Sequence, residues 1–395
     1  MHGDPLMEVT DAMPEDVVLL KAALDRLRLK DRFTERPAVP VRPLTLNVEN
    51  AGTAFRFLTA YCAQLPGCEV VLDGCERMHH RPIGPLVDAL RALGANIDYV
   101  GETGFPPLHI IGTTLHHPTI GDSRTIHHPP STIHNSPSGA HSTIHYPLST
   151  SISSQFASAL ELIGVPCDAP ASPYLTMTRE IIKHYPQSTI HIPQSTIHIP
   201  QSTIHIPQST IHNPQEKDWS SAAFWYEYVA LHGGEIELPG LSQDSLQGDK
   251  VVADIFRSFG VDTLYSSACV RVQSTIHIPT IGDSRTIHIP PSTIHINFSS
   301  CPDLYPAVAM ACKELGYGLQ ATGIENLRYK ESDRVTSVEA MLSTPQGQTV
   351  MTEHDHRIAM AAMAAGYKVD DEDCVNKSYP NFKRELCKLL SQGEA

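Results

Sequence analysis

Apolar residues recur at helical spacing in many separate stretches of this sequence. In residues 15–29, for example, Val17, Leu20, Leu24 and Leu27 would share one face of a helix. The same spacing predicts further helices at residues 53–63, 82–93, with Pro82 in its first turn, 154–163, 174–183, 221–231, 250–259, 304–315, 334–341 and 356–365. Short apolar runs predict strands at residues 70–72, 97–100, 108–111, 236–238 and 318–322. The alternation of strands and helices indicates an α/β protein built of repeated β/α units.

A short repeat interrupts these patterns. The unit Ser-Thr-Ile-His occurs eight times, and four copies between Gln187 and Pro214 follow a seven-residue period. A proline in each heptad rules out a continuous helix, while isoleucine and histidine alternate as they would in a strand. We therefore predict extended, proline-broken and poorly ordered tracts, and we assign their histidines no metal. The three tracts span residues 113–150, 184–215 and 273–296, and the four heptad histidines are His191, His198, His205 and His212.

Composition and charge narrow the function classes. A net charge of −14 and an isoelectric point of about 5.8 argue against a protein that coats nucleic acid. No run of 18 apolar residues predicts a membrane span, and residues 1–8 do not resemble a secretory signal. The nine cysteines form no CxxC pair, which indicates reduced thiols of a cytoplasmic protein. Neither GxGxxG nor GxxxxGK[ST] is present, so a nucleotide-phosphate loop is disfavoured.

Three segments place polar groups at predicted helix starts. Residues 50–56 (NAGTAFR) would expose backbone N–H groups that can hold an anion, or would form an ordinary cap followed by a surface arginine. Arg81 precedes a proline, where its planar fork could bind carboxylate or phosphate, or could belong to a solvated basic turn. Ser153, Ser154 and Gln155 suit a phosphate or a polyol, although a plain serine cap is common.

Residues 326–334 (NLRYKESDR) are more informative. Lys330 and Arg334 flank Glu331 and, four residues apart, would share a helical face. Such a setting would bind an anion and tune Glu331 as a proton donor or acceptor, whereas the ordinary alternative is a solvated charge run. His354 and His356 stand two apart in HDHR, which is poor helical spacing for a metal.

The order of the motifs along the chain resembles the 5-enolpyruvylshikimate-3-phosphate synthase family. The series is NAGTAFR, RPIG, SSQF, DWSSA, SLQGD, PDL, KESDR, HDHR and K-S-Y-P, and it runs from about Asp11 to Leu390. The resemblance implies a two-lobed enolpyruvyl transferase fold around a central cleft, with lobes at residues 11–217 and 218–395. It also implies transfer of an enolpyruvyl group from phosphoenolpyruvate to the 5-hydroxyl of shikimate 3-phosphate, with release of phosphate, in the shikimate pathway of aromatic amino-acid biosynthesis. The family needs no metal and no organic cofactor, and the expected protein is a cytoplasmic monomer whose partners are these two small molecules.

The resemblance also implies roles for single residues. Asp303 would be the general base, Glu331 would protonate the methylene carbon, and His356 would lie near the enolpyruvyl group. The residues expected to hold phosphoenolpyruvate are Gly52, Arg81, Gln155, Arg334, Arg357 and Lys377. The residues expected to hold shikimate 3-phosphate are Ser153, Ser154, Gln155, Tyr174, Asp303, Asn326 and Lys330.

The sequence departs from the family pattern in two further ways. The family begins with a strand and a Lys-Ser-x-Ser-Asn-Arg motif, and neither precedes the family-like sequence here, so the first lobe is expected to be incomplete. Ala171 stands where the family has a phosphate-binding serine, with Ser172 one place along. Two alternatives therefore stay open. One is a catalytically impaired or inactive family member, and the other is the sister enolpyruvyl transferase that acts on a nucleotide sugar in cell-wall synthesis, which KESDR, HDHR and SSQF fit less well.

Overall fold

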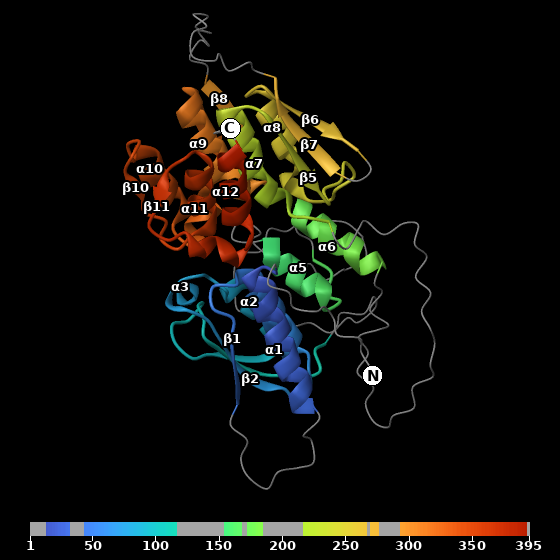
Figure 1. Cartoon of the computed structure of the whole chain (residues 1–395). Helices are drawn as coiled ribbons and strands as arrows, with labels where there is room; N and C mark the ends of the chain where they lie inside the picture. The colour runs from blue at the N-terminus through green and yellow to red at the C-terminus, as the bar shows by residue number, and fades with distance from the viewer. Residues whose placement is uncertain are drawn as a thin grey trace, which may run out of the picture.

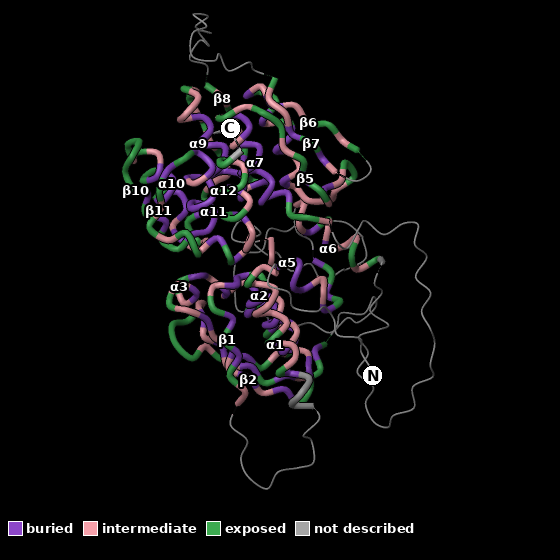
Figure 2. Tube along the Cα trace, in the orientation of Figure 1, coloured by how far each residue is buried: buried purple, intermediate pink, exposed green. Residues whose placement is uncertain are grey.

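Two hydrophobic cores organise the molecule. The computed structural model describes residues 13–31, 43–116, 154–167, 172–184, 216–266, 269–275 and 293–392. One core is built from residues 23–175 and the other from residues 219–386. Figure 1 shows the two halves of the chain as separate bodies, and Figure 2 shows buried residues inside each. The proposed lobe boundary at residues 217 and 218 falls between the two cores, which supports it as a proposal.

The N-terminal half packs helices against a four-stranded sheet. The strands lie in the order β1-β2-β4-β3, with β1 parallel to β2 and the other neighbours antiparallel. Val70 and Leu72 on β2 alternate with half-buried residues, so one face of the strand points into the core. The elements are α1 (Glu15–Asp31), β1 (Leu44–Asn47), α2 (Gly52–Ala63), β2 (Glu69–Asp73), α3 (Glu76–His79), α4 (Gly84–Ala92), β3 (Asn96–Tyr99), β4 (Leu108–Ile111), α5 (Ser154–Leu162) and α6 (Pro173–His184).

The C-terminal half surrounds the buried helix α7 (Trp219–His232). Asp218 caps this helix by accepting hydrogen bonds from the N–H groups of Ser220 and Ser221. An antiparallel sheet of order β5-β7-β6 and a parallel pair, β8 with β9, lie around it. The remaining elements are β5 (Glu235–Pro239), η2 (Gly248–Val251), α8 (Val252–Arg257), β6 (Val261–Tyr265), β7 (Cys269–Ser274), β8 (Thr293–Asn297), η3 (Pro302–Leu304), α9 (Tyr305–Leu315), β9 (Gly318–Thr322), η4 (Glu325–Tyr329), α10 (Arg334–Ser343), β10 (Thr349–Val350), α11 (His356–Ala364), β11 (Lys368–Val369), η5 (Asp373–Lys377) and α12 (Phe382–Gln392).

Most predicted elements are present, with two shifted boundaries. The helix predicted at residues 82–93 begins at Gly84, so Pro85 rather than Pro82 occupies its first turn. The helix predicted at residues 250–259 is a 3₁₀ turn followed by the short helix α8. The sequence patterns missed β1, α3, β6, β7, β8, β10, β11 and α12. The strands and α3 are too short to carry much periodic signal. Helix α12 was overlooked although Phe382, Leu386 and Leu389 stand at helical spacing.

The third repeat tract is partly ordered, contrary to the prediction. Its first residues end β7, and Thr293–Ile296 forms most of β8, which pairs in parallel with β9. The predicted extended conformation is therefore confirmed there, and the predicted disorder is wrong at both ends, because a neighbouring strand supplies the backbone hydrogen bonds. Residues 117–150, 185–215 and 276–292 lie outside the described residues, and so do the four heptad histidines.

Two further observations bear on chemistry. None of the helices in the described ranges is long and apolar enough to span a membrane. All nine cysteines lie in the described part of the chain, and each is free of a disulfide.

Candidate active site

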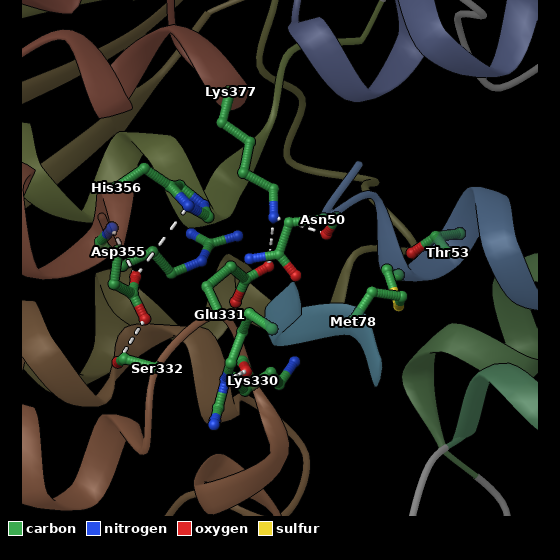
Figure 3. Close-up of polar contacts among 12 residues, drawn as sticks. Asn50, Thr53, Met78, Lys330, Glu331, Ser332, Asp355, His356 and Lys377 are labelled. Atoms are coloured by element: carbon green, nitrogen blue, oxygen red, sulfur yellow. Dashed lines mark hydrogen bonds and ion pairs between the residues drawn. The ribbon is translucent and has the colours of Figure 1, made fainter. Parts of the chain in front are cut away.

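Charged side chains from both halves of the chain meet between the two bodies (Figure 3). The C-terminal half supplies them from short connections and helix starts. Asp303 lies in η3, Glu331 precedes α10, and Asp355 caps α11 by accepting a hydrogen bond from the N–H of Arg357 at 3.0 Å. Helix starts leave backbone N–H groups free, and this explains why acidic caps and anion-binding side chains gather there.

Arg334 lies at the centre of this cluster. Its side chain is 1% exposed and donates to three carboxylates from three different segments. Nη1 lies 2.8 Å from Asp303 Oδ1, Nη2 lies 2.6 Å from Glu331 Oε2, and Nε lies 2.9 Å from Asp355 Oδ2. Burial opposes the charge, but the three carboxylates outweigh it and raise the pKa of Arg334. The guanidinium is therefore a fixed cation that joins η3, α10 and α11.

Glu331 is held between two cations. Its second oxygen, Oε1, accepts a hydrogen bond from Lys377 Nζ at 2.8 Å. Burial would raise the pKa of this carboxyl, but Lys377, Arg334 and Arg81 together hold it well below its usual range. Glu331 is thus an ionised carboxylate in this arrangement, and its protonation depends on how strongly the nearby cations are engaged.

Asp303 has a similar setting, with three cations around one carboxylate. Oδ1 lies 3.3 Å from Lys330 Nζ and 2.8 Å from Arg334 Nη1, and Oδ2 lies 3.2 Å from Arg357 Nη2. Burial raises the pKa of Asp303, but Arg357, Lys330 and Arg334 lower it more strongly, so the group is ionised. The predicted helical face shared by Lys330 and Arg334 is wrong, because η4 ends before Lys330 and α10 begins at Arg334. The two cations meet at Asp303 instead.

Arg81 forms the N-terminal wall of the cluster. Its side chain is buried, and Nη1 donates to the backbone oxygen of Asn50 at 3.0 Å and to its Oδ1 at 3.1 Å. A side chain at Gly52 would meet this guanidinium, since an added Cβ would lie 2.3 Å from Arg81 Nη2. Gly52 therefore allows Arg81 to lie against the start of α2.

Arg56 is buried beside Arg81, so the expectation of a surface arginine is wrong. It donates to the backbone oxygens of Gly52 at 3.0 Å and Pro82 at 3.2 Å. Burial and the neighbouring Arg81 lower its pKa well below the usual value. The N-terminal wall thus carries two adjacent cations whose partners here are neutral oxygens and, for Arg56, the Sδ of Met78.

Two contacts tie the halves together at this place. Lys377, at the end of η5, donates from Nζ to the backbone oxygen of Asn50 at 2.9 Å, as Figure 3 shows. Arg77 of α3 donates to the backbone oxygens of Lys330 at 3.1 Å and Arg328 at 3.0 Å. A cavity of about 840 Å³ opens beside these contacts and is lined by Asn50, Arg77, Glu331 and Lys377 among others.

His356 opens α11 next to this cluster. It is 3% exposed, and its Nδ1 is buried without a hydrogen-bond partner, 4.0 Å from Asp355 Oδ1. Burial, followed by the charge of Arg357, lowers the pKa of His356 to about 3. The imidazole is therefore neutral near pH 7.

Only some of the residues predicted to hold shikimate 3-phosphate lie in this charged cluster. Gln155 donates to Thr53 Oγ1 at 2.7 Å, which joins α5 to the start of α2. Tyr174 lies on α6, where burial, together with Asp249 and Asp303, raises its pKa well above the usual value. Ser154 opens α5 and Asn326 lies in η4, both half-buried, while Ser153 and Ala171 lie outside the described residues. Ser172 accepts a hydrogen bond from the N–H of Leu175 and so caps α6.

Sequence reasoning missed several acidic residues of the site. Asp355 was present only as part of HDHR, and Asp16, at the start of α1, carried no separate signal. Burial raises the pKa of Asp16 to about 6, against the opposing effect of Lys377. Asp249 is 2% exposed, accepts a hydrogen bond from Ser220, and has a second oxygen without a partner. Burial and the negative charge of Asp303 raise its pKa to about 7.

No cluster of three or more His, Cys, Asp or Glu within the described ranges could hold a metal ion.

Comparison with known proteins identifies the family. A family model described as EPSP synthase (3-phosphoshikimate 1-carboxyvinyltransferase) matches residues 6–123 and 148–386. The chain belongs to the EPSP synthase family. The 3-phosphoshikimate 1-carboxyvinyltransferase of Bacteroides fragilis is 30% identical over 381 residues, covering 87% of this chain and 82% of that protein. The corresponding protein of Methanospirillum hungatei is 28% identical, covering 87% and 79%.

Solved structures confirm the expected fold. The EPSP synthase structure from Acinetobacter baumannii superposes with a TM-score of 0.52 at 20% identity, covering 89% of this chain and 79% of that one. A second structure of EPSP synthase from the same organism gives a TM-score of 0.53. The expected family and its α/β enolpyruvyl transferase fold are thereby confirmed, and the sister nucleotide-sugar transferase is not favoured.

Proposed function

We propose that this protein transfers the enolpyruvyl group of phosphoenolpyruvate to the 5-hydroxyl of shikimate 3-phosphate and releases phosphate. The observation that carries the proposal is the arrangement of Asp303 and Glu331 on a shared arginine, Arg334, beside cations of both halves. Each substrate carries a phosphate and a carboxylate, so a site for both must offer several cations close to a base and an acid. In this cluster the cations, the base and the acid are connected to one another by hydrogen bonds and ion pairs.

The proposed binding roles follow the family resemblance and the geometry around Asn50. Arg81 and Lys377 both donate to Asn50, which supports a joint role in holding phosphoenolpyruvate. Lys330 already contacts Asp303, which supports its place beside the hydroxyl of the second substrate. The full proposed set for phosphoenolpyruvate is Gly52, Arg81, Gln155, Arg334, Arg357 and Lys377. The full proposed set for shikimate 3-phosphate is Ser153, Ser154, Gln155, Tyr174, Asp303, Asn326 and Lys330.

The proposed chemistry uses the two carboxylates in opposite directions. Asp303, ionised beside three cations, accepts the proton of the 5-hydroxyl. Glu331 gives a proton to the methylene carbon, and the 5-oxygen bonds to the neighbouring carbon, which forms a tetrahedral intermediate. Glu331, now deprotonated, takes a proton back from the new methyl group as the bond from the intermediate's carbon to the phosphate oxygen breaks and phosphate leaves. Bound substrate anions would engage Lys377 and Arg334, which raises the pKa of Glu331 and lets it carry the proton it donates.

The experiment that tests the proposal is a coupled assay of phosphate release by the purified full chain. Release should require both phosphoenolpyruvate and shikimate 3-phosphate, and either substrate alone serves as the control. Mass spectrometry should find one enolpyruvyl ether per phosphate released. No turnover would support the inactive alternative, and turnover with a nucleotide sugar in place of shikimate 3-phosphate would support the sister transferase.

We also propose that the protein works as a cytoplasmic monomer. The described residues of the charged cluster all come from one chain, and the nine cysteines are free, as expected in a reducing compartment. Sedimentation at micromolar concentration tests the oligomeric state, and a defined dimer would contradict it. Fractionation of cells that express the chain tests the compartment.

A further inference from the structure

Arg77 makes a connection between the two halves that the proposed binding roles do not use. Its Nε donates to the backbone oxygen of Lys330 at 3.1 Å, and its Nη2 donates to that of Arg328 at 3.0 Å. The partners are 253 and 251 residues away along the chain. One planar guanidinium therefore holds two carbonyl groups at the end of η4, a geometry that a lysine ammonium does not reproduce.

The short helix that carries Arg77 is held firmly in the N-terminal half. Arg77 belongs to α3, whose next residue, Met78, is fully buried in the core. His79 of the same turn lies 2.7 Å from Asp73 at the end of β2. The arginine thus extends from an anchored turn towards the other half of the molecule.

The segment that Arg77 holds has little regular structure of its own. Between η4 and α10 the chain is extended at Lys330, with φ −85° and ψ −159°. Carbonyls at the end of a helical turn lack partners within it, so a donor from outside is needed to fix them. This same short segment presents Lys330 to Asp303 and Glu331 to both Arg334 and Lys377.

We propose that Arg77 is a positioning residue of the reaction, which fixes the backbone of residues 328–331 so that Lys330 and Glu331 reach the substrates when the two halves are together. The inference rests on the proposed function. Arg77 acts through the backbone and touches no reacting group, so it should affect the catalytic step more than substrate affinity. A misplacement of about 1 Å at a reacting group can cost roughly 10²-fold in rate.

The test compares Arg77→Gln and Arg77→Lys with a matched control, Arg328→Gln. Arg328 belongs to the same segment, but its exposed side chain pairs with Asp333 rather than across the halves. We expect Arg77→Gln to lower kcat about 10–100-fold with KM values changed less than about threefold. Arg77→Lys should recover part of the loss, and Arg328→Gln should stay within about twofold of the original chain.

A second measurement keeps the inference independent of activity. Hydrogen exchange should become faster in the peptide that covers residues 325–333 of Arg77→Gln, with the other peptides and the melting temperature unchanged. Unchanged exchange in that peptide, or unchanged kcat, would overturn the inference. Faster exchange throughout the protein would also overturn it, since it would show a general structural role. If the unaltered chain shows no turnover, the proposed function fails, and the exchange data alone decide whether Arg77 holds the segment.

Discussion

The two walls of the charged cluster are built on different electrostatic plans. In the C-terminal half, Arg334, Lys330 and Arg357 each contact a carboxylate, and Arg334 contacts three. In the N-terminal half, Arg56 and Arg81 donate to backbone and amide oxygens. The C-terminal wall is therefore close to internal neutrality, whereas the N-terminal wall carries positive charge without a carboxylate bound to it.

This difference assigns different tasks to the walls. Buried cations that share neutral partners are costly, and an arriving phosphate or carboxylate relieves that cost. Cations already bound to carboxylates must exchange partners before they can hold a ligand. The N-terminal wall can thus bind an anion without first breaking an ion pair. The C-terminal wall holds the acid and the base in defined positions, and their pKa values change when its cations change partners.

The largest effect should come from removing the acid or the base from the C-terminal wall. Glu331→Gln and Asp303→Asn keep size and polarity but remove the proton-transfer group, so each should reduce kcat by at least about 10³-fold. Glu339→Gln, on the exposed face of α10, is the matched control and should leave kcat unchanged. Turnover in either site variant above about a tenth of the original rate would contradict the assigned roles.

Removing Arg334 should break the C-terminal wall itself. Arg334→Ala leaves three buried carboxylates without their shared cation, and the free energy of unfolding should fall by roughly 3–5 kcal/mol. Arg81→Ala should lower the free energy of unfolding by clearly less, because it also removes the repulsion between the charges of Arg81 and Arg56. Urea denaturation of the two variants measures the difference, and equal losses would show that the two walls do not differ as described.

Replacing Arg81 by glutamine or lysine tests whether the N-terminal wall binds the anionic substrate. We expect Arg81→Gln to raise the KM for phosphoenolpyruvate about 10–100-fold, since one charge-assisted fork is lost. Arg81→Lys should retain part of the affinity, because it keeps the charge without the planar geometry. Steady-state kinetics with phosphoenolpyruvate as the varied substrate measures both, and an unchanged KM in Arg81→Gln would remove the distinction between the walls.

Asp249 offers the smallest and most local test, because it is an acid of the C-terminal half that is bound to a serine rather than to a cation. Its pKa is raised from 3.8 to about 7 in the folded protein by burial first and by Asp303 second. The folded state therefore binds this proton more tightly than the unfolded state, and stability is lost as the pH rises from about 4 to about 7.

The variant Asp249→Asn has no such proton to lose. Relative to the original chain, its free energy of unfolding should gain roughly 1–4 kcal/mol between about pH 5 and about pH 8. Urea titrations at the two pH values measure the change. A constant difference between the two proteins would indicate that Asp249 is ionised throughout this range.

Several site residues were predictable because local chain chemistry marks them. Arg81 before a proline, Glu331 between two basic residues and His356 beside an aspartate lie at a helix start or within three residues before one, where polar groups concentrate. The family resemblance then supplied their expected roles. The prediction that Lys330 and Arg334 share a helical face is wrong, because η4 ends at Tyr329 and Asp333 caps α10, which begins at Arg334.

Other features could not be read from local sequence. The sequence around Arg56 is compatible with an arginine on the surface, yet the packing of α2 buries this side chain beside Arg81. The contacts of Arg77 depend on carbonyls more than 250 residues away. The last repeat unit forms a strand only because β9 lies beside it in parallel register.

The sequence by itself determined the alternation of helices and strands, the family and the motifs that carry the charged groups, because these depend on nearest neighbours along the chain. The tertiary structure decided which charges pair, which are buried and which carboxyl groups are ionised. Those outcomes depend on distances between segments that are far apart in sequence, and on the removal of water when the two halves meet.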